Sequence, residues 1–150
     1  SNNKLSFNDI QFDIPDNINA LVLSRIDILP ETIKKCLQCA SVIGIEFYQQ
    51  ILNELAKKLN EKNNMDDSIL NLIDLDFIRK NKINEKLFFF KHVITKDVTY
   101  NTILKSNRKI LHSIIGELIE NIFYLSVEHV LGLNRLDLLK ENVNFEEQVH

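Results

Sequence analysis

Apolar residues recur every three to four positions through most of the chain, and this period predicts helices. Gly44 is expected to end one of them, because glycine favours the position that follows a helix. In the first half the pattern predicts helices over residues 17–29, 30–43 and 48–60, and a fourth with apolar positions at 69–75 behind the capping residues 66–68. The N-terminal half is therefore predicted to be a bundle of short helices.

The period of the pattern changes near residue 77. Residues 77–80 and 87–91 are predicted to be two short strands, and the polar residues 81–86 between them form the loop of a hairpin. Helices are expected again over 92–105 and 107–124. This order of elements predicts a mostly α protein with a small β-hairpin.

The same order predicts how the chain is divided. We expect a winged-helix-like domain over residues 15–92 and a helical extension packed on it over 93–124. Residues 1–14 are expected to be an extended segment. Residues 125–150 are expected to be either loosely held or helical around Leu131, Leu133, Leu136 and Leu139.

Glycine is scarce, since Gly44, Gly116 and Gly132 are the only three in 150 residues. The sequence holds neither G-x-x-x-x-G-K-[ST] nor G-x-G-x-x-G, the glycine-rich loops that bring backbone amides against phosphates. The composition, 45% hydrophobic and 26% charged, is that of a folded chain with a sizeable core. We therefore expect this chain to fold without being an enzyme and without a cofactor or metal of its own.

The chain is slightly acidic, with a formal net charge of −3. A dedicated nucleic-acid-binding protein usually has a basic excess, so no nucleic-acid partner is expected. The apolar runs are too short to span a bilayer, and no membrane partner is expected either. Cys36 and Cys39 lie in one predicted helix, where we expect both to fill the core. Such use of cysteine fits a reducing, cytoplasmic location.

Positive charges gather in residues 87–112, where five basic residues and one acidic residue give a charge of +4. Such a run either contacts nucleotide phosphates or an acidic neighbouring domain, or it is a solvated helix face. His112 lies one helical turn from Arg108, but no nucleophile accompanies the pair, so packing or an interdomain hydrogen bond is expected. The five basic residues are Lys91, Lys96, Lys105, Arg108 and Lys109.

The helix before the hairpin is the element that reads the DNA groove in many winged-helix proteins. Here that segment has no basic residue between Met65 and Phe77. The negatively charged phosphate backbone of DNA repels a helix that carries acidic residues and no basic ones, so duplex binding is not expected. Its four acidic residues are Asp66, Asp67, Asp74 and Asp76.

Four ordered blocks within residues 14–122 resemble a known family. The first is I-P-D-N-I-N-A-L-V-L-S-R-I-D-I-L over residues 14–29, and the second is L-Q-C-A-S-V-I-G-I-E-F over residues 37–47. The third is L-N-L-I-D-L-D-F-I over residues 70–78, and the fourth begins F-K-H-V-I-T-K-D-V-T-Y at residue 90 and runs to His112. Together they resemble the region that follows the nucleotide-binding core in signal-transduction ATPases with numerous domains, as in soluble adenylyl-cyclase-like proteins.

This resemblance implies a winged-helix regulatory region of a larger protein. The parent would bind ATP or ADP with Mg in a core outside this chain, and would be linked to a class III adenylyl or guanylyl cyclase. The implied partners are neighbouring domains of the same polypeptide, namely the nucleotide-binding core and helical repeats.

His92 stands where related ATPases place a Met-His-Asp motif whose histidine approaches the ADP phosphate. The resemblance therefore implies a nucleotide-sensing or interdomain role for His92. The alternative is a core-edge position on the strand face of Phe88 and Phe90. The same sensing or interdomain role is implied for Lys91, Lys96 and Arg108.

Phe89 stands where relatives usually have a polar residue, which implies a contact surface for another domain. Lys105 and Lys109 are expected on the same interaction surface. We therefore expect a non-catalytic regulatory and interaction module that couples nucleotide state to domain rearrangement in cyclic nucleotide signalling. Two alternatives stay open, a DNA-binding winged-helix transcription regulator and a protein-docking domain independent of nucleotide.

Overall fold

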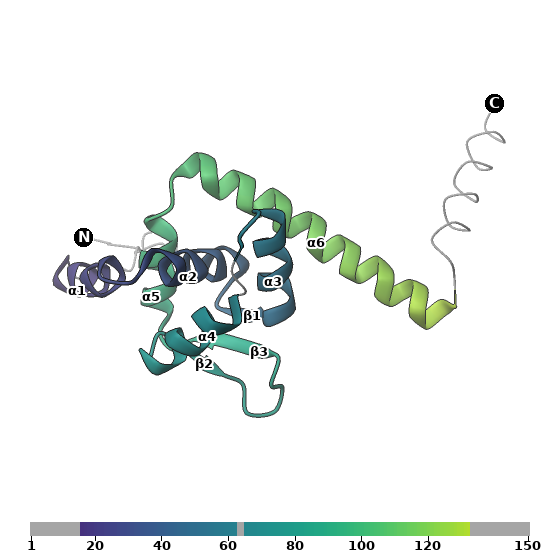
Figure 1. The fold of residues 1–150 in the computed structure, drawn as a ribbon, viewed down its shortest axis with the longest axis horizontal. Helices are drawn as coiled ribbons and strands as arrows, with labels where there is room; N and C mark the ends of the chain where they lie inside the picture. Colours follow the sequence, from purple (N-terminus) through teal and green to yellow (C-terminus); the bar gives the residue numbers. More distant parts are fainter. Residues whose placement is uncertain (1–15, 63–64, 133–150) are drawn as a thin grey trace, which may run out of the picture.

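The structure, a computed structural model, describes residues 16–62 and 65–132, which form a mostly α fold with a small β-sheet, as predicted (Figure 1). The helices are α1 (Asp16–Asp27), α2 (Glu31–Ile43), α3 (Gln49–Lys58), α4 (Met65–Asp74), α5 (Val93–Asn101) and α6 (Lys105–Leu131). The strands are β1 (Glu46–Tyr48), β2 (Ile78–Lys80) and β3 (Leu87–Phe90).

The three strands form one antiparallel sheet in the order β1-β3-β2. The hairpin of β2 and β3 confirms the two predicted strands, and Ile78 lies opposite Phe90 in it. The third strand, β1, was not predicted, because the sequence pattern assigned Tyr48 to a helix. In β1, Phe47 pairs with Phe88. The succession α2-β1-α3-α4-β2-β3 is the order of elements in a winged helix, and the β2–β3 hairpin is the wing.

The core lies between the inner face of the sheet and helices α2, α3 and α4. Phe47 stacks on Phe88 and meets Phe90 edge-on, with 6.0 Å between ring centroids in each pair. Each of the three helices adds a fully buried side chain to the core, and these are Leu37, Leu52 and Leu72. The apolar stripes that predicted the helices are therefore the surfaces that the fold buries.

Helix α1 closes one side of this body and packs against α5. It buries Val22 and Ile26. Arg25 holds α1 to the segment between α4 and β2: its guanidinium lies 4.6 Å from the centroid of Phe77, and Nη2 donates to the backbone oxygen of Leu75 at 3.0 Å. The cation and the ring thus fix a helix that buries few residues of its own.

Helix α6 is longer than predicted and runs out of the body (Figure 1). Its first half packs on α2 and α3 and buries Leu111, Ile115 and Leu118. The predicted end at residue 124 is wrong, because the helix continues to Leu131, where Gly132 follows in the left-handed conformation with φ 63°. The extended segment expected over 1–14, and the part of the expected tail beyond 132, lie outside the described residues.

Smaller boundaries differ from the predictions too. Helix α4 begins at Met65, so the residues expected to cap it lie inside its first turn, where Asp66 and Asp67 favour the helix dipole. Helix α5 ends at Asn101, four residues before the predicted end. The expected stop at Gly44 is confirmed, and its amide donates to the oxygen of Ala40.

Phe47 offers the sharpest test of this core. It is 2% exposed, whereas Phe123 on the projecting end of α6 is 64% exposed. Phe47→Ala should therefore lower the free energy of unfolding by about 3–5 kcal/mol in urea titrations. The matched variant Phe123→Ala should change it by no more than about 0.5 kcal/mol, and equal losses for the two variants would contradict the fold.

Candidate functional site

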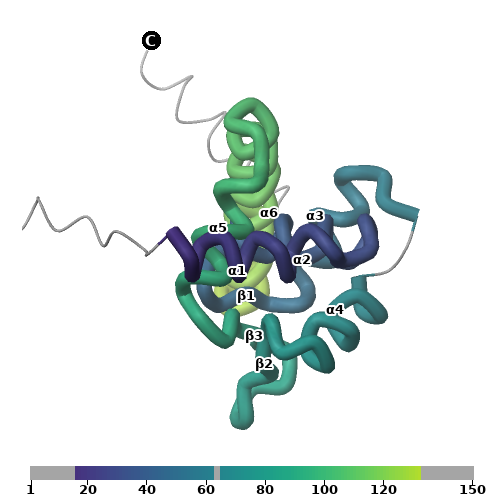
Figure 2. The backbone as a smooth tube through the Cα atoms, turned by 90° about the vertical axis from the view of Figure 1, so that its left-hand side faces the viewer, coloured from purple at the N-terminus to yellow at the C-terminus, as the bar shows by residue number. Residues whose placement is uncertain are grey.

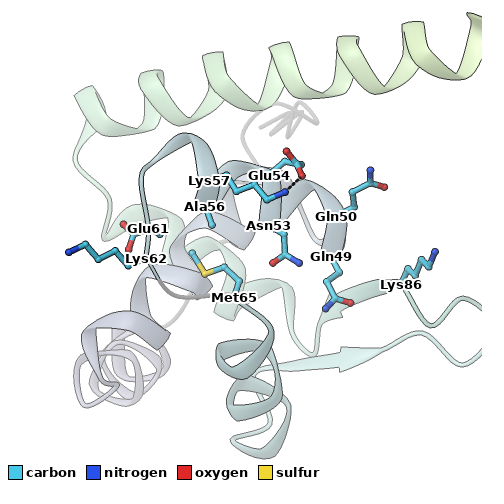
Figure 3. Close-up of a pocket in the computed structure, with 10 residues that line it drawn as sticks. All are labelled: Gln49, Gln50, Asn53, Glu54, Ala56, Lys57, Glu61, Lys62, Met65 and Lys86. Carbon is cyan, nitrogen blue, oxygen red and sulfur yellow. Dashed lines mark hydrogen bonds and ion pairs between the residues drawn. The ribbon is translucent and has the colours of Figure 1, made fainter.

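A groove of about 580 Å³ runs along α3 and the beginning of α4 (Figure 3). Gln49 and Asn53 donate to the same oxygen of Asp66, at 2.6 and 3.1 Å. Glu54 forms an ion pair with Lys57 at 2.6 Å on the rim. These amides and paired charges include no nucleophile beside a base, so the groove fits a polar contact better than a reaction.

Lys91 lies at the base of the wing and forms an ion pair with Asp76. Arg79 approaches the same carboxylate at 3.9 Å. Asp76 adopts a left-handed backbone, φ 63°, a conformation that aspartate tolerates better than most residues. The hydrogen bond from Lys91 lowers the pKa of this exposed carboxyl below its usual value; slight desolvation opposes the shift, and the positive charges nearby add to it. Lys91 is thus engaged in holding the wing to the end of α4.

His92 joins β3 to α5. Its backbone is extended and its carbonyl accepts from the amides of Thr95 and Lys96, so the residue begins α5. The His92 side chain is exposed. The core-edge interpretation of His92 is therefore wrong, and its imidazole is free to meet another group at the joint between the wing and α5.

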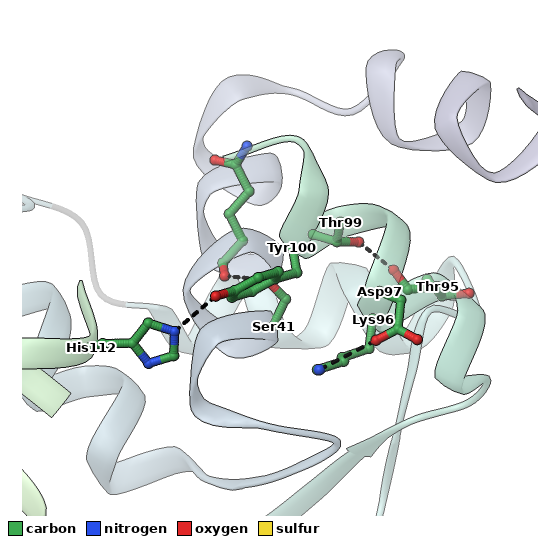
Figure 4. A network of polar contacts seen from close by, with 8 residues as sticks. Ser41, Thr95, Lys96, Asp97, Thr99, Tyr100 and His112 are labelled. Atoms are coloured by element: carbon green, nitrogen blue, oxygen red, sulfur yellow. Dashed lines mark hydrogen bonds and ion pairs between the residues drawn. The ribbon is translucent and has the colours of Figure 1, made fainter. Parts of the chain in front are cut away.

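Tyr100 is the centre of a polar junction between α5 and α6 (Figure 4). Its hydroxyl lies 3.0 Å from Nε2 of His112. The guanidinium of Arg108 lies 4.6 Å from the ring centroid, and Nζ of Lys96 lies 5.5 Å from it. Lys96 also contacts Asp97 at 3.3 Å. Two of the predicted site residues, Lys96 and Arg108, therefore meet on one aromatic ring.

Arg108 also closes the end of α5. Its Nε donates to the oxygen of Ile103 at 2.8 Å, and Nη2 donates to the oxygen of Asn101 at 3.2 Å. Carbonyls at the end of a helix lack partners within it, so these bonds stabilise the turn into α6. The sequence pattern could not show this role, because backbone acceptors leave no mark in the residue types.

The predicted basic segment is not one cluster. Lys91 pairs with Asp76 at the base of the wing, whereas Lys96 and Arg108 lie over the ring of Tyr100. Lys105 and Lys109 are exposed on the first turns of α6, at the other end of the molecule from the wing (Figure 1). The charge of +4 is therefore divided among three settings, and only the last is a freely exposed face.

Phe89 lies on the outer face of the sheet, between Glu46 of β1 and Arg79 of β2. It is half-buried. The neighbouring cross-strand pair on this face joins Tyr48, which is exposed, to Leu87. The outer face thus carries a short, partly exposed apolar strip.

The projecting end of α6 exposes several large apolar side chains, none of which is a predicted site residue. By length and composition alone, α6 is long and apolar enough to cross a membrane. Glu117 and Glu120 lie in the middle of the helix, however, and ionised carboxylates are costly in hydrocarbon. The exposed apolar residues of this end are Ile119, Phe123, Tyr124, Leu125, Val130 and Leu131. We call these six residues the α6 patch.

The two cysteines lie in the core of α2, as predicted. Burial raises the pKa of the Cys36 thiol to about 12 and that of the Cys39 thiol to about 11. Neither is therefore a thiolate near neutral pH, the form that attacks or binds metal. Within residues 16–62 and 65–132, no group of three His, Cys, Asp or Glu side chains could hold a metal ion.

Comparison with known proteins adds no relative: no family model, no curated protein and no solved structure matches the chain.

The junction at Tyr100 can be tested by substitution. Arg108→Ala removes two hydrogen bonds to backbone oxygens and the cation from the ring, and should cost about 1–2 kcal/mol of unfolding free energy. Lys109→Ala, one residue on and exposed, should change it by no more than about 0.5 kcal/mol. Urea titration measures both, and an Arg108→Ala loss no larger than that of Lys109→Ala would show that the junction does not hold α6.

Proposed function

We propose that this chain is a non-catalytic winged-helix regulatory module of a multidomain signalling ATPase linked to a class III nucleotide cyclase. Its partners are neighbouring domains of the same polypeptide. It transmits the nucleotide state of an ATP- or ADP-binding core, outside this chain, as a change in domain arrangement. The proposal places the module in the cytoplasm and leaves ATP, ADP and Mg to the parent protein.

The observation that carries the proposal is the α6 patch. Its large apolar side chains are all exposed within residues 119–131 of one helix, and soluble monomers rarely expose this much apolar surface in one place unless it contacts a partner. The patch continues directly from a half-helix that is packed on α2 and α3. A helical arm with an apolar end suits a module that passes a movement to the next domain.

The chemistry of the described residues also favours a non-catalytic role. The groove along α3 has amides and paired charges, and the buried thiols keep their protons. The polar junction at Tyr100 has cations and an imidazole but no nucleophile beside a base. These features stabilise the fold and leave no reacting group.

His92 is the residue that best suits the sensing role. Its exposed imidazole stands at the joint of the wing and α5, where a bond to a phosphate oxygen would pull on both elements. Lys91 is half-buried in its ion pair with Asp76, so it supports the joint rather than reaching outward. Sensing is thus assigned to His92 and support to Lys91.

The DNA-binding alternative has less in its favour. Helix α4, which would enter the groove, carries exposed Asp67 and Asp74 and ends next to Asp76. A phosphate backbone would meet these carboxylates first. The docking alternative without nucleotide shares the α6 patch with our proposal, and the nucleotide measurements below separate the two.

Calorimetry tests whether the nucleotide binds to the core outside this chain rather than to the chain itself. Titration of ATP or ADP, each with Mg, into this chain should give no binding, because its described residues offer no phosphate-holding loop. The polypeptide that also includes the sequence preceding this chain in its gene should bind ADP. His92→Ala in that polypeptide should weaken ADP binding about tenfold, the effect of one hydrogen bond to a charged group.

His129→Ala is the matched control, since His129 is exposed on α6 far from the wing. It should leave ADP binding unchanged. Micromolar binding to the isolated chain would contradict the proposal, as would equal effects of the two histidine variants. No nucleotide binding by the longer polypeptide would favour the docking alternative.

A further inference from the structure

The wing loop, residues 79–86, presents one apolar side chain at its tip. Ile83 is 97% exposed. In Figures 1 and 2, which differ by a quarter turn, the loop between β2 and β3 lies at the lower edge of the molecule, beyond the helices. A flat surface can therefore reach the tip of the wing without meeting the rest of the described fold.

The loop holds Ile83 in this position through its own hydrogen bonds. Oδ1 of Asn81 accepts from the amides of Ile83 and Asn84, at 2.8 and 3.0 Å. Oδ1 of Asn84 accepts from the amide of Lys86 at 3.1 Å. The tip is thus ordered before it meets a partner, which reduces the entropy that binding has to overcome.

The loop that carries this apolar tip is positively charged. The wing loop has four basic residues and one acidic residue, Glu85, for a net charge of +3. Arg79 and Lys80 have only long ion pairs of 3.9 Å, with Asp76 and Glu85. Lys82 directly precedes Ile83, Lys86 follows it three residues later in the same loop, and both lysines are exposed. An apolar tip on a loop of positive charge matches a surface that is anionic outside and apolar beneath.

We propose that the wing tip is a peripheral docking point for an anionic phospholipid bilayer. Lys82 and Lys86 meet the headgroup phosphates, and Ile83 enters the boundary with the acyl chains. Cytoplasmic leaflets carry such anionic lipids, and each lysine near them adds to binding. The interaction is weak and reversible, so it orients a larger protein at the membrane rather than anchoring it.

The charges near the wing favour a bilayer over a nucleic acid. Asp76 lies at the base of the wing, and α4, which packs against β2, carries Asp67 and Asp74. A nucleic acid wrapped around the wing would bring phosphates against these carboxylates. A planar bilayer touches the tip alone and leaves the acidic helix in water.

This inference goes beyond the proposed function and uses a different part of the surface. It revises the expectation of no membrane partner, which was based on the lack of a spanning run. A peripheral contact through a loop needs no such run.

Vesicle co-sedimentation tests the proposal with the chain as it stands. The chain should sediment with vesicles of equal parts phosphatidylcholine and phosphatidylserine at low salt, and not with pure phosphatidylcholine. Lys82→Gln should weaken binding about fivefold, the effect of one charge near an anionic surface. Ile83→Asn should weaken it about tenfold, because it removes the inserted side chain.

The neighbouring pair Lys109 and Ile110 on α6 supplies matched controls, since both are exposed and lie away from the wing. Lys109→Gln and Ile110→Asn should bind the anionic vesicles as the unchanged chain does, with helix content checked by circular dichroism. Equal losses from the wing and control variants would overturn the proposal. So would an absence of vesicle binding, or binding to labelled single-stranded or duplex DNA in the same buffer with none to vesicles.

Discussion

The contact of Phe47 with Phe88 and Phe90 is the constraint on which the rest of the fold depends. It ties the short strand after α2 to the central strand β3, so that the sheet has an inner face and the wing a fixed direction. Because β3 runs directly into α5, the same contact sets where Lys91 ends the wing and His92 faces outward. A signal received at the wing would therefore reach α5 through a rigid connection rather than through a flexible linker.

A second connection carries this geometry to α6. Arg108 of α6 donates hydrogen bonds to backbone oxygens at the end of α5, and its guanidinium lies over the ring of Tyr100. The direction of α6 therefore depends on α5. The described fold thus exposes three regions for which we propose contacts: His92, the wing tip with Ile83, and the α6 patch. Under the proposed function these regions would couple partners, whereas the buried thiols and paired charges contribute to stability.

The sequence predicted the helical body well, because apolar stripes such as that of α2 report burial directly. It missed β1, because a strand of only three residues is too short to show an alternating period and Tyr48 continues the helical pattern of α3. It placed the end of α6 too early, since apolar residues exposed on all sides lose the period that marks a helix. The role of Arg108 depends on backbone oxygens and that of Asp76 on a left-handed turn, and neither leaves a pattern in residue types. His92 was singled out by resemblance, and its exposure could be known only from the structure.

The central claim is that the α6 patch is a surface for a neighbouring domain, and hydrogen exchange measured along α6 tests it most directly. In the isolated chain, amides of residues 105–118 should exchange slowly, because that half is packed on α2 and α3, whereas amides of 119–131 should exchange quickly. In a longer polypeptide that includes the neighbouring domains, residues 119–131 should become slow as well. Slow exchange along the whole of α6 in the isolated chain would contradict the claim, because the patch would then already be covered.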